Sequence, residues 1–164
     1  MAVFPADLVE LSQRIGSVLR ARGETVAVAE GSAGGLVSAT LLATPGASAY
    51  YVGGTIVYTA AAARAWMAGA VDAPAGMRGA TEEFAAYLAA STRIKLGTTW
   101  GLGEAGAAGP PNPYGDPAGH SWLAVDGPVV VTRNVSTGLD SRPDNMVEFT
   151  RATLELFATT LDQA

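Results

Sequence analysis

A carboxylate, a hydroxyl and three glycines stand together near residue 30, between an apolar run and a helix-like pattern. The stretch Thr25–Leu42 reads TVAVAEGSAGGLVSATLL, which we interpret as a strand, a tight turn and a helix. The first backbone N–H groups of such a helix are unpaired, and with the helix dipole they favour an anion. The stretch therefore predicts a phosphate or carboxylate site. The alternative is that the glycines only allow close packing, because neither GxGxxG nor GxxxxGK[ST] is present.

Five side chains within this stretch and beyond it have functional groups that could take part in chemistry. Glu30 and Glu104 each end a predicted strand beside a glycine-containing loop, and two carboxylates in one cleft could do acid–base work or hold a metal. Ser32 could act as a nucleophile only with an adjacent base; otherwise its hydroxyl is expected to cap the helix. His120, the only histidine, could contact a ligand or lie incidentally at a strand start. Lys95, the only lysine, is expected at a solvated helix end.

Composition limits the function classes. The length of 164 residues predicts one domain, residues 1–164. Ten Lys and Arg against 15 Asp and Glu give a net charge of −5 without a basic cluster, which disfavours nucleic acid. There is no cysteine, and no run of 18 apolar residues or signal-like start. We therefore expect a cytoplasmic protein that contacts no nucleic acid and no membrane and holds no metal or cofactor.

Periodicity places these residues on or beside regular elements. Apolar residues at helical spacing predict a first helix over Ala6–Arg22 and a last one from about Asp144, while Thr59 and Thr81 are predicted N-caps of two helices between them. The glycine pair in YYVGGTIVY predicts a bulge or a close backbone approach within a strand. Further strands are expected over 98–103, 121–125 and 129–133, the last two joined by a turn that contains Asp-Gly.

The order of these elements predicts an α/β fold, a three-layer α/β/α sandwich with a mixed, mostly parallel sheet. Ligands of such folds bind beyond the carboxyl ends of strands. The turns after Glu30, Tyr58 and Glu104 have that position, and we expect them to converge on one pocket. Tyr58 would stack on a ligand there or pack as a buried aromatic residue.

Several separated motifs resemble those of the CinA C-terminal domain family over nearly the whole chain. They are AEGSAGG, GGTIVYT, GAT before a helix, AGAAGP, the Pro117-Ala118-Gly119 turn before a strand, and a terminal helix that bears an arginine. The resemblance implies the fold just described. For active family members it also implies hydrolysis of nicotinamide mononucleotide, which releases ammonia and leaves the carboxylate form.

The catalytic motifs of the family are altered in this sequence. Gly31 stands where the family motif E-S-C-T-G-G has its nucleophilic serine. In the run that matches Y-S-N-E-A-K, Tyr58 is kept but Ala63 replaces the lysine that serves as base. Ala105 replaces the threonine of T-G-I-A-G-P, and Arg142 is the only match to the G-D-R motif. The resemblance therefore implies the scaffold without its Ser/Lys dyad.

These observations favour a CinA-family protein that binds a nucleotide-like or other phosphate-bearing small molecule, or regulates through it, without hydrolysing it. The alternative is an active amidohydrolase with a rearranged site that uses Ser32, Glu30, Glu104 or His120. A third hypothesis is a purely structural partner of another subunit, and we also expect a homo-oligomer. The expected ligand-binding residues are Glu30, Gly31, Ser32, Gly34, Gly35, Tyr58, Ala105, Gly106, Gly109 and Arg142, with Ser32 and Glu104 as catalytic candidates.

Overall fold

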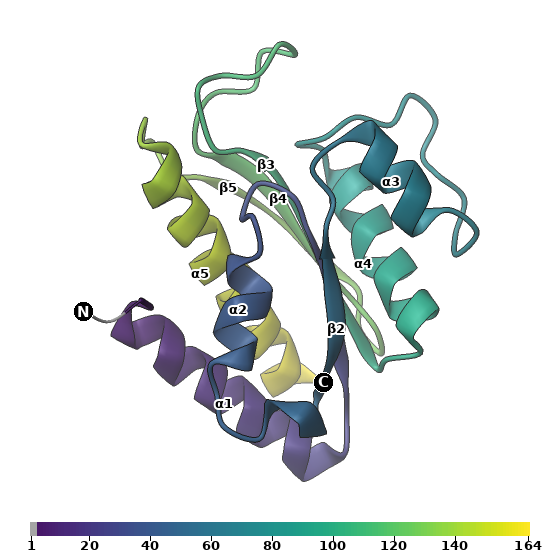
Figure 1. Cartoon of the computed structure of the whole chain (residues 1–164), viewed down its shortest axis with the longest axis vertical. Coiled ribbons are helices and arrows are strands. Elements are labelled where there is room, and N and C mark those ends of the chain that lie inside the picture. The colour runs from purple at the N-terminus through teal and green to yellow at the C-terminus, as the bar shows by residue number, and fades with distance from the viewer. Residues whose placement is uncertain (1–2) are drawn as a thin grey trace.

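The computed structural model describes residues 3–164 as one five-stranded sheet between two layers of helices (Figure 1). The strands are β1 (Val26–Glu30), β2 (Tyr51–Ile56), β3 (Trp100–Ala107), β4 (His120–Asp126) and β5 (Val131–Ser136). The helices are α1 (Ala6–Arg22), α2 (Leu36–Leu42), α3 (Ala60–Met67), α4 (Glu82–Leu96) and α5 (Arg142–Gln163), with a short 3-10 helix η1 (Ala47–Ala49) before β2. None of the helices within residues 3–164 has both the length and the apolar character needed to cross a membrane.

The strand order is β2-β1-β3-β4-β5. β2 and β3 run parallel to β1, whereas β4 is antiparallel to β3 and β5 is antiparallel to β4. The α/β/α sandwich and the mixed, mostly parallel sheet are confirmed, since all strands except β4 run in the same direction. β4 runs antiparallel to its two neighbours because β3, β4 and β5 are joined without a crossover helix, which parallel neighbours would need.

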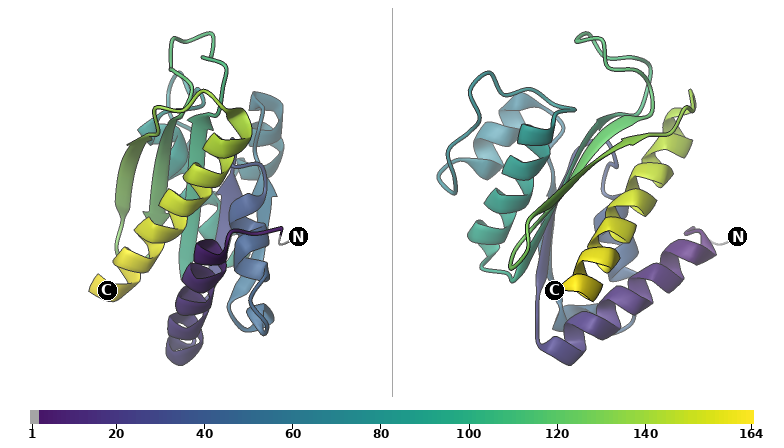
Figure 2. Two further views of the ribbon diagram at one scale, coloured as in Figure 1. Left: turned by 90° about the vertical axis from the view of Figure 1, so that its left-hand side faces the viewer. Right: turned by 180° about the vertical axis from the view of Figure 1, so that it is seen from behind.

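The two helical layers each bury one face of the sheet (Figures 1 and 2). α1, α2 and α5 cover one face, and α3 and α4 cover the other. β1 is buried along its whole length. On the α4 side, a Cβ added to Gly101 or Gly103 of β3 would lie 2.1 Å from the carbonyl oxygen of Ala89 or Ala85. These glycines let α4 pack directly on the backbone of β3.

Most predicted boundaries hold within two residues, and three details of the prediction are confirmed. The hydroxyl oxygen of Thr59 accepts a hydrogen bond from the N–H of Ala62, and that of Thr81 accepts one from the N–H of Phe84. The register of β1 against β2 shifts after Val26, as expected for a bulge near the glycine pair.

Two boundaries differ in ways that affect the site. β3 continues to Ala107, so Glu104 and the three residues after it lie in a strand and not in a loop. Their pairing with β4 overrides a small-residue sequence that has no strand periodicity. α5 begins at Arg142, two residues earlier than expected, because the Ser141 hydroxyl accepts from the N–H of Asp144 and caps the helix.

Candidate functional site

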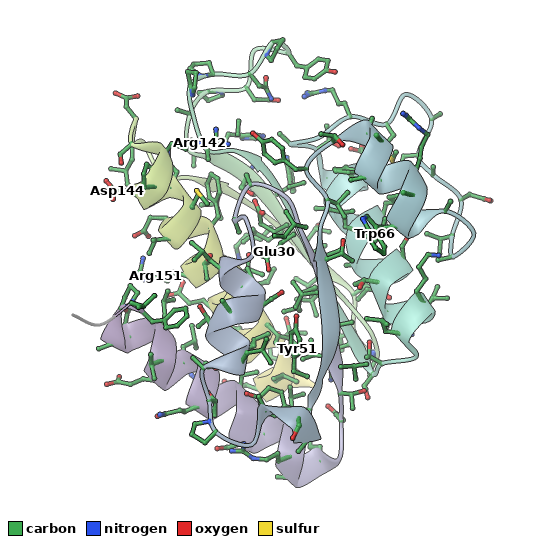
Figure 3. The ribbon with its side chains drawn as sticks, viewed as in Figure 1. Glu30, Tyr51, Trp66, Arg142, Asp144 and Arg151 are labelled. Carbon is green, nitrogen blue, oxygen red and sulfur yellow. The ribbon has the colours of Figure 1, made fainter. Side chains whose placement is uncertain are left out.

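Glu30, at the carboxyl end of β1, is fully buried and serves the start of α2. Its carboxylate accepts hydrogen bonds from the N–H groups of Gly35, Val37 and Ser38 at 2.9–3.0 Å, and from the Ser38 hydroxyl at 2.7 Å. Figure 3 shows Glu30 in the interior beside α2. The prediction of free N–H groups at this helix N-terminus is therefore wrong, because a side chain of the protein already fills the anion position.

Glu104, opposite Glu30 in the pairing of β1 with β3, holds the other half of the turn. Its carboxylate accepts from the N–H groups of Gly31 and Ala33 and from the hydroxyls of Ser32 and Ser121. The side chain is buried, and burial raises the pKa of this carboxyl, although the hydrogen bonds from Ser32, Ala33 and Ser121 act in the opposite direction. Ser121 was not predicted; it lies opposite Gly106 in the ladder of β3 with β4.

The turn between β1 and α2 is thus fixed by two interior carboxylates. The prediction that the Ser32 hydroxyl caps α2 is wrong. The N-cap is Gly35, and the Ser32 hydroxyl donates to Glu104 instead. Gly34 and Gly35 have φ values of 69° and 100°, which favour glycine. The glycines of this turn accordingly serve local backbone geometry.

A cleft of three adjoining cavities lies at the carboxyl ends of β1, β2 and β3. The cavities measure about 260, 60 and 250 Å³, and Tyr58 lines all of them. The smallest is lined by the turn after β1, by Tyr58 after β2 and by the end of β3, so the predicted convergence is confirmed. Of the expected ligand-binding residues, those that line the cleft are Gly31, Ser32, Tyr58, Ala105, Gly106, Gly109 and Arg142.

The other three expected ligand-binding residues lie away from the cleft. Glu30, Gly34 and Gly35 line none of its cavities, and Gly35 instead lines a separate groove along β2. Glu104, the second catalytic candidate, is likewise covered by the turn that it holds, since it is only 1% exposed.

Gly31 and Ala63, which the resemblance of sequence motifs aligns with a serine and a lysine, both line the cleft. Gly31 does not have a positive φ, and an added Cβ there would lie 3.2 Å from the carbonyl oxygen of Val57. Ala63 is fully buried on the first turns of α3. At these two positions the cleft wall therefore consists of backbone and a methyl group, without a nucleophile or a base.

Arg142 provides a positive charge at one end of the cleft. It stands in the first turn of α5, at the end of the sheet from which the loops emerge (Figure 3). Its guanidinium donates to the Tyr58 hydroxyl at 2.7 Å and to the Gly109 carbonyl at 2.6 Å. Among residues 3–164, no carboxylate lies within ion-pair distance of Arg142. Its charge is therefore available to an anionic ligand.

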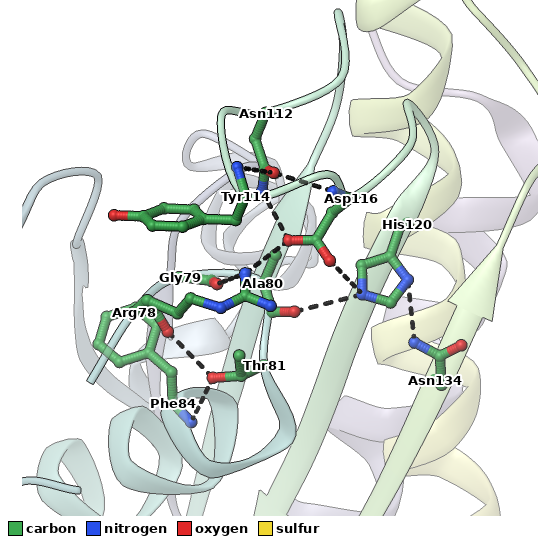
Figure 4. Close-up of polar contacts among 10 residues, drawn as sticks. All are labelled: Arg78, Gly79, Ala80, Thr81, Phe84, Asn112, Tyr114, Asp116, His120 and Asn134. Atoms are coloured by element: carbon green, nitrogen blue, oxygen red, sulfur yellow. Dashed lines mark hydrogen bonds and ion pairs between the residues drawn. The ribbon is translucent and has the colours of Figure 1, made fainter. Parts of the chain in front are cut away.

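A polar network that sequence reasoning missed holds the β3–β4 loop over the other end of the cleft (Figure 4). Arg78 donates to Asp116 at 2.6 Å, and its guanidinium lies 4.9 Å from the centre of the Tyr114 ring. This contact with Arg78 holds the pKa of Asp116 below its ordinary value. Asn112 accepts from the N–H groups of Tyr114 and Asp116, an Asx turn that the run Asn-Pro-Tyr-Gly-Asp could have indicated.

His120 belongs to this network and not to the cleft wall. Its Nε2 lies 3.2 Å from the carbonyl oxygen of Ala80, and its Nδ1 lies 3.4 Å from the side-chain nitrogen of Asn134. An imidazole that donates from Nε2 and accepts at Nδ1 satisfies both contacts. Ala80 has a φ of 56°, rare for alanine, so the histidine helps to hold a strained residue that itself lines the cleft. Lys95 lies elsewhere, beside the groove along β2.

Comparison with known proteins gives a consistent picture. The family model of the CinA C-terminal domain matches residues 8–161. A CinA-like protein of Myxococcus xanthus is 36% identical over 132 residues, which are 80% of this chain and 31% of that protein. A CinA-like protein of Anaeromyxobacter sp. (strain K) is 37% identical over 127 residues, with coverage of 77% and 31%. This chain spans about a third of the length of these curated relatives.

Solved structures match over nearly the whole chain. The competence/damage inducible protein CihA from Agrobacterium tumefaciens has a TM-score of 0.88 at 26% identity and covers 99% of both chains. A CinA superfamily protein from Klebsiella pneumoniae has a TM-score of 0.88 at 22% identity, covering 96% of this chain and 99% of that one; it supports the fold alone.

Proposed function

The chain belongs to the CinA C-terminal domain family, and from this premise we propose that it binds a phosphate-bearing small molecule without hydrolysing it. One observation carries the proposal. The positions of the family's serine and lysine, Gly31 and Ala63, still line the cleft, yet neither bears a functional group, while Arg142 keeps an uncompensated charge in the same cleft.

Hydrolysis of an amide by the family's route needs a nucleophile and a base within hydrogen-bond reach of each other. Neither Gly31 nor Ala63 can supply one. Ser32 does line the cleft, but its hydroxyl donates to Glu104, which also receives two backbone N–H groups and a second hydroxyl. Because the Glu104 carboxylate accepts from four donors and holds the turn, it is not well suited to act as a general base.

Binding of an anion is supported by the contacts of Arg142. A guanidinium matches the geometry of a phosphate and makes strong charge-assisted hydrogen bonds to it. Tyr58 offers an aromatic face on the same wall and lies with its ring centre 5.9 Å from the Arg142 guanidinium. The adjoining cavities of about 250 and 260 Å³ on either side of the narrow middle offer room for a ligand with two parts, such as a sugar phosphate carrying a base.

Calorimetry with two ligands that differ only in the phosphate tests this proposal. We expect nicotinamide mononucleotide to bind more tightly than nicotinamide riboside, by at least about tenfold, because a charged hydrogen bond contributes roughly 1.5–3 kcal/mol. Arg142→Gln should remove most of this difference. Arg133→Gln, on the exposed part of β5 at the far edge of the sheet, is the matched control and should leave it unchanged. Equal binding of both ligands to the unaltered protein would refute the role of Arg142.

A second candidate function, an amidohydrolase with a rearranged site, is favoured by one contact. Ser32 lines the cleft, and its hydroxyl donates to a carboxyl whose pKa burial raises, which is a nucleophile beside a potential base. If the protein releases ammonia from nicotinamide mononucleotide and Ser32→Ala abolishes that release, this candidate replaces the first. The contact of Ser121 with the same carboxylate provides the control, since Ser121→Ala removes a hydrogen bond to Glu104 but no nucleophile.

A further inference from the structure

A second cavity, separate from the cleft, lies between α3, α4 and the connection that joins these helices. Figures 1 and 2 show this connection, residues 68–81, leaving the end of α3 and running back along that helix before α4 begins. The cavity measures about 380 Å³, a size within the range of small-molecule sites. Its lining residues are Arg64 of α3, Tyr87 of α4, and residues 68–73 and Met77 of the connection.

Apolar side chains divide this second cavity from the cleft. Met77 lines both the second cavity and the adjoining part of the cleft, which measures about 260 Å³. Phe84 lines the cleft and stacks on Tyr87, with the two ring centres 6.3 Å apart. Tyr87 lines the second cavity and none of the cavities of the cleft. The two spaces are therefore neighbours, and a molecule in one of them leaves the other open.

The hydroxyl of Tyr87 has no hydrogen-bond partner within residues 3–164, although the residue is only 6% exposed. A buried tyrosine usually bonds its hydroxyl to a neighbouring group. Tyr50 does so, because its hydroxyl donates to the carbonyl of Leu41 at 2.7 Å. The open space beside Tyr87 is the second cavity, so a partner for its hydroxyl has to come from a molecule that enters there.

Two charged residues of opposite sign, Arg64 and Asp72, line the same cavity. Among residues 3–164 neither of them lies within ion-pair distance of the other or of any other charged group. A guanidinium binds a carboxylate through two parallel hydrogen bonds, and a carboxylate accepts hydrogen bonds from an ammonium group. The remaining side chains of the lining are apolar, the largest of them those of Val71 and Met77. The lining thus matches a ligand that carries both charges and an apolar group.

We propose that this cavity is a second binding site, and that it takes a free α-amino acid with an apolar side chain. The carboxylate of the amino acid binds Arg64 and accepts a hydrogen bond from the Tyr87 hydroxyl, while its ammonium group binds Asp72. One positive and one negative charge in the lining suit a zwitterion, whereas Asp72 repels a phosphate. The cleft differs in this respect, because the charge of Arg142 is uncompensated there.

Calorimetry with L-leucine and L-phenylalanine tests the proposal. Tyr87→Phe removes only the hydroxyl, and we expect it to weaken binding of both amino acids at least about tenfold, because the lost hydrogen bond is to a charged group. The thermal unfolding midpoint of the free protein should not fall in this variant, since the hydroxyl bonds nothing within residues 3–164. Tyr114→Phe is the control, because Tyr114 is 66% exposed and does not line this cavity.

Two analogues of leucine test which charge binds which residue. Isocaproate keeps the carboxylate and the side chain of leucine but lacks the ammonium group, and isoamylamine keeps the ammonium group but lacks the carboxylate. Arg64→Gln should weaken binding of L-leucine and isocaproate by at least about threefold, a modest factor because Arg64 is exposed, and should leave isoamylamine unaffected. Asp72→Asn should weaken binding of L-leucine and isoamylamine and leave isocaproate unaffected.

Nicotinamide mononucleotide should not compete with L-leucine, because the second cavity and the cleft are separate spaces. The test needs no ligand in the cleft, so its result does not depend on the function proposed above. The absence of binding of both amino acids at millimolar concentration would overturn the proposal. Binding that Tyr87→Phe leaves unchanged, or that nicotinamide mononucleotide displaces, would equally overturn it.

Discussion

Removal of the Glu30 carboxylate is the most informative perturbation of the turn beside the cleft. In Glu30→Ala the N–H groups of Gly35, Val37 and Ser38 and the Ser38 hydroxyl all lose their acceptor. Hydrogen bonds to a charged group contribute roughly 1.5–3 kcal/mol each. Relief of the desolvation of a buried carboxylate offsets several kcal/mol of this sum. We therefore expect the free energy of unfolding to fall by about 3–5 kcal/mol.

Urea unfolding followed by circular dichroism measures this change. Glu155→Ala removes an exposed carboxylate from α5 and serves as the control, with an expected change within about 0.5 kcal/mol. A loss of less than about 1 kcal/mol in Glu30→Ala would show that Glu30 does not satisfy the start of α2, because such a value is typical of a single exposed cap.

The same variant shows whether the turn is closed to external anions. Formate should raise the unfolding midpoint of Glu30→Ala, because a small carboxylate can occupy the vacated position and binding to the folded state stabilises it. It should not do so for the unaltered protein, in which Glu30 already fills the position. If formate or phosphate stabilised both proteins equally through this turn, the helix N-terminus would be an open anion site, contrary to our reasoning.

Three further predictions concern other residues. Ser91→Ala should raise the free energy of unfolding by about 0.5–1 kcal/mol, because the Ser91 hydroxyl is buried without a partner within residues 3–164; thermal denaturation tests this, and destabilisation would contradict it. Asp116→Asn should cost about 1 kcal/mol at neutral pH through loss of its ion pair with Arg78. The pKa of Asp116 is lowered in the folded state. The stability difference between the two proteins is therefore present above the ordinary pKa of aspartate and disappears as the pH falls through the folded-state pKa. A stability difference that does not change with pH would refute the ion pair. Gly31→Ser together with Ala63→Lys should produce ammonia from nicotinamide mononucleotide where each change alone does not; a folded double variant that binds but remains inactive would show that the site differs by more than its dyad.

Most helices and strands could be predicted from the sequence, because apolar periodicity and capping residues determine secondary structure locally. Thr59 and Thr81 cap their helices as predicted. The end of β3 could not be predicted from the sequence, since Glu104 to Ala107 carry no strand pattern and form a strand through pairing with β4.

The candidate site was predicted in position but not in its internal chemistry. Convergence of the turns after three strands followed from topology, and the cleft confirms it. The roles of Glu30 and Glu104 did not follow, because a sequence does not show that two carboxylates beside glycines turn inward and bond the same turn. The register of β1 against β3 places Glu30 opposite Glu104, and this register is known only from the structure.

Assay of ammonia release from saturating nicotinamide mononucleotide, on a sample whose binding has been shown by calorimetry, tests most directly the claim that the cleft binds without hydrolysing. We predict heat of binding but no ammonia above the rate without protein, because neither Gly31 nor Ala63 provides a reactive group. Turnover on the scale of roughly one per second, which is ordinary for enzymes, would contradict the claim.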